Sequence, residues 1–302
     1  MSELSAVTGA FGYIGKYITQ RLLSEGRQVI TLTNKPATLS PFGDQVKAYP
    51  LNFSNLEELT AALVGVETLY NTYWIRFNYR QITFERAINN TRMLFQAAHS
   101  AGVQRVVHIS ITNPGVDSPL PYFHGKAEIE GYLQQYDWIY HIIRPTVVFG
   151  QEDILINNIA YLLRHLPVFV IPGSGNYRLQ PIYVEDLARI AIQAGQSSEN
   201  QIIDAVGPDT LSFKALVHLI AAAVGSRAWI IHLPPALGLL LSRVIGVLLN
   251  DVLLTPDELK GLMAELLISR QTPTGQTSIR DWLAANAETC GAAYASELQR
   301  HY

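Results

Sequence analysis

Three glycines at three-residue spacing follow the first apolar run of the chain and precede a helical pattern. The segment Ala6–Gly15 has the sequence AVTGAFGYIG, and the expected strand ends at Thr8. Gly9 allows a tight turn, Gly12 leaves room for the backbone to approach a phosphate, and Gly15 lets the helix pack on the strand. The helix N-terminus adds N–H groups with positive partial charge. The segment therefore predicts a turn that binds the pyrophosphate of a dinucleotide.

The N-terminal half alternates short β-rich apolar runs with helical patterns, which is typical of a parallel sheet with crossover helices. We predict an α/β fold with a Rossmann-type, doubly wound parallel sheet and a smaller, mainly helical C-terminal lobe. The predicted strands are Leu4–Thr8, Gln28–Thr33, Val46–Leu51, Thr68–Asn71, Arg105–Ile111, Trp138–Ile143 and Ile202–Val206. The predicted helices are Gly12–Glu25, Leu56–Leu63, Thr83–Ala101, Tyr122–Gln135, Ile154–His165 and Glu185–Ala194.

The end of the second predicted strand indicates which dinucleotide is preferred. The ribose 2′-hydroxyl of NAD usually meets an Asp or Glu about twenty residues after the glycine turn. This chain has Thr33, Asn34 and Lys35 there instead. A carboxylate would repel a 2′-phosphate, whereas hydroxyl, amide and ammonium groups can hold one. We therefore predict that the chain binds NADP(H), with NAD(H) as the alternative. It also stays open that Lys35 is an ordinary surface lysine that contacts only solvent.

The regular alternation loosens after residue 149, and the chain is mostly helical from residue 211 onward. We predict an NAD(P)-binding Rossmann domain over residues 1–150, to which residues 181–206 return. Residues 151–180 and 207–302 are expected to form a C-terminal lobe that serves a substrate or a partner.

The longest apolar stretch, Ala236–Leu249, lies in this lobe and is interrupted by Arg243. It is short for a membrane-spanning helix, so no transmembrane segment is predicted. We expect a helix buried in the lobe. A surface that meets an apolar substrate, a partner or a membrane is the alternative.

Composition excludes several classes of function. Lys and Arg number 22 against 25 Asp and Glu, and this net charge of −3 offers no basic surplus for a nucleic-acid partner. The single cysteine, Cys290, cannot form an intramolecular disulfide, and no Cys/His spacing predicts a zinc site or another metal centre. The N-terminal sequence lacks the basic and apolar regions of a signal peptide, so we expect a cytoplasmic location.

Tyr122 and Lys126 are four residues apart on a predicted helix and therefore share one face. An ammonium near a phenol favours the phenolate, which eases proton transfer near neutral pH. A hydroxyl at the end of the preceding strand, Ser110 or Thr112, could polarise a carbonyl. His108 lies within an apolar strand pattern and is expected to be a buried structural histidine.

The turn TGxxGxxG (Thr8 to Gly15), the Ser110/Tyr122/Lys126 arrangement and the segment IIRPTVVFG together resemble the short-chain dehydrogenase/reductase superfamily, in its extended or atypical branch. More narrowly, RPTVVFGQEDILINNIAYLL and PVFVIPGSGNYRLQPIYVEDLA resemble the group of the nucleotide-binding accessory subunit of respiratory complex I. The NmrA-like and epimerase-like NAD(P)-binding proteins are similar as well. The resemblance covers residues 4–206.

The resemblance implies a role for each matching residue. The pyrophosphate would lie against Gly9, Phe11, Gly12, Tyr13, Ile14 and Gly15. Asn52 and Phe53 would contact adenine, and Asn71–Trp74, including Thr72 and Tyr73, would lie along the cofactor. Pro145, Thr146, Val147 and Val148 would meet the nicotinamide carboxamide. Lys126 would bind the nicotinamide ribose, Tyr122 would exchange a proton with the substrate, and Ser110 or Thr112 would supply the orienting hydroxyl.

The chain also departs from the family pattern. Extended members usually have small residues after the fourth strand, where this chain has Tyr73 and Trp74. The usual N-x-x-G-T of the next helix becomes Ala87-x-x-Asn90-Thr91, so its asparagine is missing and Asn90 stands at the glycine position. We therefore keep three hypotheses: an oxidoreductase that transfers hydride to or from a carbonyl or alcohol, a non-catalytic NAD(P)H-binding sensor or assembly subunit, and an NAD-dependent epimerase or dehydratase. The substrate is expected to be a small molecule, with a hydrophobic one favoured by the apolar lobe. Oligomeric state stays open, with a homodimer as one alternative.

Overall fold

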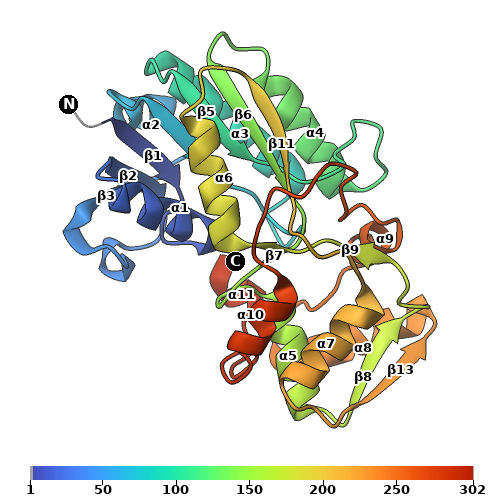
Figure 1. Cartoon of the computed structure of the whole chain (residues 1–302). Helices are drawn as coiled ribbons and strands as arrows, with labels where there is room; N and C mark the ends of the chain where they lie inside the picture. The colour runs from blue at the N-terminus through green and yellow to red at the C-terminus, as the bar shows by residue number, and fades with distance from the viewer. Residues whose placement is uncertain (1–2, 302) are drawn as a thin grey trace. The chain divides into compact units, whose positions relative to one another are not determined.

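The computed structural model describes residues 3–301, and the chain divides into two compact units (Figure 1). The first unit contains the residues up to Pro145 together with Val184–Ala205. The second contains Thr146–Tyr183 and the residues from Val206 onward. The functional assignment of the two parts stays a prediction.

The first unit is built on a seven-stranded sheet with the order β11-β6-β5-β4-β1-β2-β3, in which every pair of neighbouring strands is parallel. Parallel strands that are covered on both faces need apolar runs, and of the central strands β4 is buried throughout and β1 at every residue except Leu4. The predicted fold class is therefore confirmed. The strands are β1 (Leu4–Thr8), β2 (Gln28–Thr33), β3 (Val46–Pro50), β4 (Thr68–Asn71), β5 (Arg105–Ile109), β6 (Ile139–Pro145) and β11 (Gln201–Ala205).

Helices cover both faces of this sheet (Figure 1). The pair α1 (Tyr13–Ser24) and α6 (Val184–Gly195) covers one face. The opposite face carries α2 (Leu56–Leu63), α3 (Phe84–Ser100) and α4 (Pro121–Leu133), which pack on each other in chain order. Two short 3₁₀ turns, η1 (Ala37–Leu39) and η2 (Gly43–Gln45), lie between β2 and β3.

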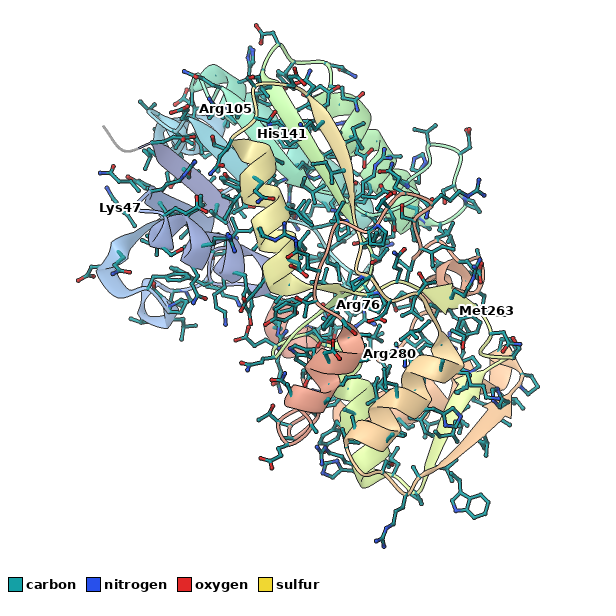
Figure 2. All side chains as sticks on the ribbon, in the orientation of Figure 1. Lys47, Arg76, Arg105, His141, Met263 and Arg280 are labelled. Carbon is teal, nitrogen blue, oxygen red and sulfur yellow. The ribbon has the colours of Figure 1, made fainter. Side chains whose placement is uncertain are left out.

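The two edges of the sheet differ in chemistry. At the amino-terminal edge, Arg105 on β5 pairs with Glu67 (Nη1···Oε1 2.6 Å) and Glu3 (Nη1···Oε1 3.2 Å). Figure 2 labels Arg105 there, together with His141 on the neighbouring β6. The carboxyl edge, where Thr8 and the ends of the other strands meet, is where a doubly wound sheet binds its ligand.

The second unit combines three two-stranded pairs with helices. Parallel pairing joins β7 (Val148–Phe149) to β10 (Ile182–Tyr183) and β8 (Val168–Pro172) to β13 (Trp229–Leu233), and β9 (Arg178–Leu179) pairs with β12 (Leu211–Ser212) in antiparallel orientation. The sequence analysis did not predict any of these pairs. The helices are α5 (Leu155–His165), α7 (Phe213–Ala223), α8 (Pro235–Leu249), α9 (Pro256–Met263), α10 (Ile279–Ala285) and α11 (Glu297–His301).

The expectation that Ala236–Leu249 is buried is wrong. The segment does form a helix, α8, but only Gly238 and Gly246 on it are buried. A Cβ on Gly238 would lie 3.1 Å from the Pro172 side chain, and one on Gly246 would lie 2.6 Å from the Asp251 carbonyl oxygen. The glycine side of the helix packs on the unit, so most of the large aliphatic side chains face solvent.

Phe95 on α3 tests the packing of the first unit. Its side chain is fully buried, with its ring 5.9 Å from that of Trp138. We expect Phe95→Ala to lower the free energy of unfolding by about 3–5 kcal/mol, because it removes buried apolar surface and leaves a cavity. Urea unfolding followed by tryptophan fluorescence measures this. Val116→Ala, at a side chain 62% exposed, is the control and should change it by less than about 0.5 kcal/mol.

Candidate functional site

The turn between β1 and α1 has the geometry that a dinucleotide pyrophosphate requires. Gly9 adopts a φ of +66°, and the Gly12 N–H donates to its carbonyl oxygen at 2.7 Å. A Cβ on Gly15 would lie 2.3 Å from the same oxygen, so only glycine lets α1 approach β1 this closely. A Cβ on Gly12 would lie 3.1 Å from the Gly9 carbonyl oxygen and would leave less space in the turn for a phosphate. These residues fit a bound pyrophosphate.

The start of α1 offers its backbone to an anion. Gly12 is the N-cap residue, no side chain caps the helix, and the first turn carries no acid. Amide groups at a helix N-terminus attract phosphate by their hydrogen atoms and by the helix dipole. Phe11, Tyr13 and Ile14, predicted to lie along the pyrophosphate, are half-buried in the same segment.

The end of β2 is tied to this turn by Lys35. Its ammonium donates to the Phe11 carbonyl oxygen (Nζ···O 3.3 Å), and its backbone N–H donates to the Thr33 hydroxyl at 3.1 Å. Asn34 between them is exposed. The segment thus carries a cation, an amide and a hydroxyl beside the phosphate turn.

The segment after β4 is fixed to the end of β1 through the Thr8 hydroxyl. That hydroxyl accepts from the backbone N–H groups of Thr72 (2.8 Å) and Tyr73 (3.1 Å) and donates to Asn71 Oδ1 at 3.0 Å. The Thr72 hydroxyl in turn donates to the Thr8 carbonyl oxygen at 2.6 Å. Thr72 therefore lies next to the phosphate turn, where a Cβ on Gly9 would be 3.6 Å from its Oγ1.

The residues predicted to contact adenine have protein partners in this structure. Asn52 donates from Nδ2 to Glu58 Oε2 at 2.8 Å. The ring of Phe53 packs against that of Tyr73, with centroids 4.8 Å apart, and the Tyr73 hydroxyl accepts from Asn90 Nδ2 at 2.8 Å. Asn90, at the position where the family usually has glycine, thus holds the bulky Tyr73 in place.

Trp74 covers the predicted ribose-binding lysine. Lys126 is only 2% exposed, and its Nζ lies 4.5 Å from the centroid of the Trp74 ring. The same Nζ donates to the Ile109 carbonyl oxygen at 2.7 Å. A Cβ on Gly125 would lie 3.2 Å from Trp74, so glycine at this position lets the indole rest on α4. In this conformation Lys126 bonds to protein groups.

Burial changes the protonation of Lys126. Desolvation lowers the pKa of its ammonium to about 7, and the nearby Glu130 carboxylate has the smaller, opposite effect of raising this pKa. At neutral pH the side chain is therefore only partly charged. Tyr122, four residues earlier on α4, is half-buried and packs edge-on against Trp74 and Phe84, with centroids 6.2 and 6.0 Å away.

Glu130 is a site residue that sequence reasoning did not single out. It is 4% exposed and accepts from the Ser110 hydroxyl at 2.5 Å. Arg144 on β6 binds the same carboxylate through Nε (3.0 Å) and Nη2 (2.5 Å). The Ser110 hydroxyl therefore donates its hydrogen bond to the Glu130 carboxylate and not to a substrate carbonyl. Thr112, the alternative to Ser110 as the hydroxyl that would orient a substrate carbonyl, is fully buried. Its backbone N–H donates to the Pro145 carbonyl oxygen at 2.9 Å.

His108 is buried, as the sequence analysis expected. Its Nδ1 accepts from Asn71 Nδ2 at 3.0 Å, so the ring proton is on Nε2. Desolvation first, and the charge of Lys126 second, hold the pKa of His108 well below its usual value. The neutral ring therefore orients Asn71. Among residues 3–301, no group of three or more His, Cys, Asp or Glu side chains could hold a metal ion.

The predicted nicotinamide segment is divided between the two units. Pro145 ends β6 in the first unit, whereas Thr146, Val147 and Val148 belong to the second. Within the second unit the Thr146 hydroxyl donates to the Gln180 carbonyl oxygen, and the Val147 carbonyl oxygen accepts from the Ile182 N–H at 2.8 Å. The contact of this segment with nicotinamide stays a prediction, as do the other assigned roles.

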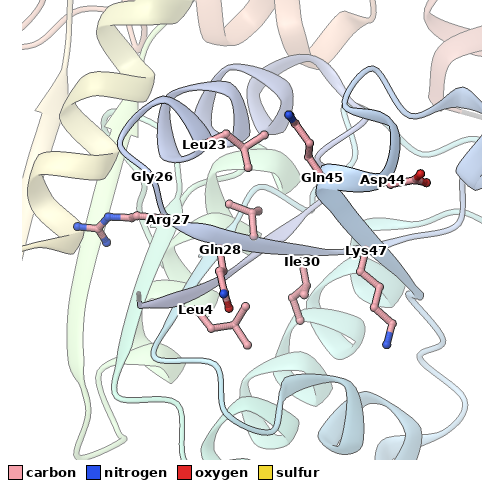
Figure 3. A pocket seen from close by; sticks show the side chains of 10 residues that line it. Leu4, Leu23, Gly26, Arg27, Gln28, Ile30, Asp44, Gln45 and Lys47 are labelled. Atoms are coloured by element: carbon pink, nitrogen blue, oxygen red, sulfur yellow. The ribbon is translucent and has the colours of Figure 1, made fainter. Parts of the chain in front are cut away.

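A cavity of about 510 Å³ lies elsewhere in the first unit (Figure 3). Leu4 and Gln28, the first residues of β1 and β2, are among its lining residues, as are Leu23 near the end of α1 and Lys47 on β3. These residues belong to the amino-terminal edge of the sheet, opposite the glycine turn. The cavity is therefore separate from the candidate site.

Comparison with known proteins supports a nucleotide-binding unit. A family described as NAD(P)H-binding matches residues 9–154. The chain is 27% identical over 292 residues to the mitochondrial NADH dehydrogenase [ubiquinone] 1 alpha subcomplex subunit 9 of Mus musculus, covering 92% of this chain and 75% of the relative.

Two solved structures share the fold. Triphenylmethane reductase of Citrobacter sp., complexed with NADP(H), matches with a TM-score of 0.75 and 18% identity, covering 95% of this chain and 100% of that one. NADPH-dependent quinone oxidoreductase of Escherichia coli, complexed with NADPH, matches with a TM-score of 0.74 and 21% identity, covering 94% and 98%. Residues 9–154 are thus similar to the NAD(P)H-binding family, and these two structures show that the chain has their fold.

Proposed function

We propose that the first unit binds NADP(H) in preference to NAD(H). The observation that carries this proposal is the position of Lys35, whose ammonium lies on the phosphate turn with its Nζ 3.3 Å from the Phe11 carbonyl oxygen. An ammonium at this position attracts a 2′-phosphate, and Thr33 and Asn34 add a hydroxyl and an amide. Gly9, Gly12 and Gly15 would hold the pyrophosphate against the start of α1.

The proposed reaction is the reduction or oxidation of a small carbonyl or alcohol compound. Bound nicotinamide would supply or accept the hydride, which is the difficult part of the chemistry. Tyr122 would give the proton to the substrate oxygen during reduction and take it back during oxidation. Because the Ser110 hydroxyl donates to Glu130, Ser110 does not orient the carbonyl in the conformation described, and Tyr122 carries that task.

A non-catalytic NADP(H)-binding protein is the second candidate. The ring of Trp74 over Lys126 favours it, because a lysine 2% exposed must be uncovered before it can bind a ribose. The lowered pKa of Lys126 also weakens the charge that would favour a Tyr122 phenolate. An epimerase or dehydratase with tightly held NAD is less well supported, since the residues that directly follow β2, Asn34 and Lys35, are not acids. Location in the cytoplasm stays a prediction.

Nucleotide titrations test the cofactor preference. We expect NADPH to bind at least tenfold more tightly than NADH, as followed by nicotinamide fluorescence. Lys35→Gln should raise the Kd for NADPH about tenfold and leave that for NADH nearly unchanged, because it removes one charged contact to a phosphate. Gly12→Asp should abolish binding of both. Lys47→Gln, on β3 at the cavity of Figure 3, is the matched control. Equal losses for both nucleotides in Lys35→Gln would contradict the preference.

Turnover separates the two candidates. With NADPH and a panel of small aldehydes, ketones and quinones, we expect oxidation of NADPH that falls roughly 100-fold or more in Tyr122→Phe, because the proton donor is lost. Tyr136→Phe is the matched control and should keep the activity. If neither the natural chain nor Trp74→Ala turns over while both bind NADPH, the second candidate holds and the oxidoreductase proposal is wrong.

The buried ammonium of Lys126 predicts a pH dependence of stability. The pKa is about 7 in the folded chain against 10.5 for an ordinary lysine, so between these values the unfolded chain binds a proton that the folded chain does not. Stability should therefore rise with pH across this window, by on the order of 1 kcal/mol per pH unit for this group. Urea unfolding from pH 7 to 10 should show this slope in the natural chain relative to Lys126→Met. Lys260→Met, at an exposed lysine, is the control. If the free energy of unfolding changes with pH equally in the natural chain and in Lys126→Met, the lowered pKa assigned to Lys126 is wrong.

A further inference from the structure

Helix α8 in the second unit presents an apolar stripe to solvent. Val247 and Leu248 are 81% and 80% exposed, whereas Gly238 and Gly246 are buried on the other side of the helix. At 100° per residue the exposed aliphatic side chains occupy an arc of roughly 120°. This is the reverse of an ordinary surface helix, whose apolar stripe faces the core. The stripe consists of Leu237, Leu240, Leu241, Val244, Val247 and Leu248.

Neighbouring elements extend the apolar surface. Strand β13, which leads directly into α8, exposes Trp229 (77%) and Ile231 (38%). Met263 of α9, labelled in Figure 2, is 42% exposed. It lies beside the start of α8, because a Cβ on Gly173 would be 3.7 Å from both Met263 Cε and Pro235 Cγ. Because α8 packs on β8, the strand to which β13 is paired, these exposed apolar side chains lie on neighbouring elements, and an exposed apolar patch on a folded chain marks an interaction surface.

The segment that carries β13 and α8 has charged side chains of one sign, and the exposed Asp257 of α9 lies outside this segment. Residues 210–250 contain no Asp or Glu, and their three Lys and Arg residues, Lys214, Arg227 and Arg243, are all exposed. Arg243 lies on α8 itself, next to the stripe on the helical wheel. This part of the chain therefore complements a negatively charged surface.

We propose that α8 lies in the headgroup region of an anionic lipid bilayer, with its Leu and Val side chains in the acyl boundary. An interfacial helix has this combination of aliphatic face, flanking cations and nearby tryptophan. The 15 residues of α8 extend about 22 Å, too short to span a bilayer. Within residues 3–301 no helix is long and apolar enough to cross one. A protein interface concentrates aromatic residues in its core, whereas the stripe on α8 is entirely aliphatic and Trp229 lies outside it on β13.

Flotation with lipid vesicles tests this proposal on the full chain. We expect binding to vesicles of phosphatidylcholine with phosphatidylglycerol, and weak binding to phosphatidylcholine alone. Val247→Gln/Leu248→Gln should reduce the partition coefficient about tenfold or more, because two aliphatic side chains no longer enter the acyl boundary. Both positions are exposed and glutamine suits a helix, so the variant is expected to fold. A blue shift of tryptophan emission on binding should be lost in Trp229→Phe.

Leu39→Gln/Val64→Gln is the matched control, since it changes two aliphatic side chains 64% and 66% exposed in the first unit. It should bind vesicles like the natural chain. Equal binding to neutral and anionic vesicles, or binding that Val247→Gln/Leu248→Gln leaves unchanged, would overturn the proposal. A dimer by light scattering that this same variant dissociates, without vesicle binding, would overturn it in favour of an interface between two copies.

Discussion

The close approach of α1 to the end of β1 is the constraint on which the candidate site depends. A Cβ on Gly15 would lie 2.3 Å from the Gly9 carbonyl oxygen, so any side chain there would push the helix away from the strand. The same turn is bound to its neighbours: the Gly9 N–H donates to Leu32 on β2 at 2.9 Å, and the Thr8 hydroxyl holds the segment after β4. Hydrogen bonds therefore link the phosphate turn, the Lys35 ammonium and Thr72 into one edge of the site.

The buried face of α4 differs from this edge because it carries two buried ionisable side chains. Lys126 and Glu130 lie one helical turn apart and are both buried, and each bonds to a group on β5 or β6. Glu130 is paired with Arg144 and hydrogen-bonded to Ser110, which compensates the cost of burying its charge. Lys126 has a carbonyl oxygen, the face of Trp74 and the more distant charge of Glu130, which do not offset the desolvation of its ammonium, so its pKa falls. The proposed pyrophosphate contacts and the proposed proton transfer thus rest on separate sets of residues, and Trp74 lies over Lys126 without touching the glycine turn's own hydrogen bonds.

Much of the first unit could be predicted from the sequence, because strands buried on both faces leave apolar runs that helical patterns separate. The strand Gln28–Thr33 is predicted in this way, and the glycine turn is predicted from the spacing of its three glycines. The contacts of α4 could not, since the pairing of Glu130 with Arg144 and the covering of Lys126 by Trp74 depend on how α4 packs on other elements. The orientation of α8 was missed for a related reason: hydrophobicity marks an apolar face, and only tertiary packing decides that the glycine face is the buried one. Strands β8 and β13 were missed because they form a small separate pair.

Hydrogen exchange of the backbone amides tests most directly whether the glycine turn is the nucleotide site. With saturating NADPH, residues 9–16 and 33–35 should exchange more slowly, since their N–H groups and side chains would hold the phosphates. Peptides from the amino-terminal edge of the sheet, around the cavity of Figure 3, should exchange as before. Protection confined to that cavity, or no protection of residues 9–16 while NADPH is bound, would contradict the account.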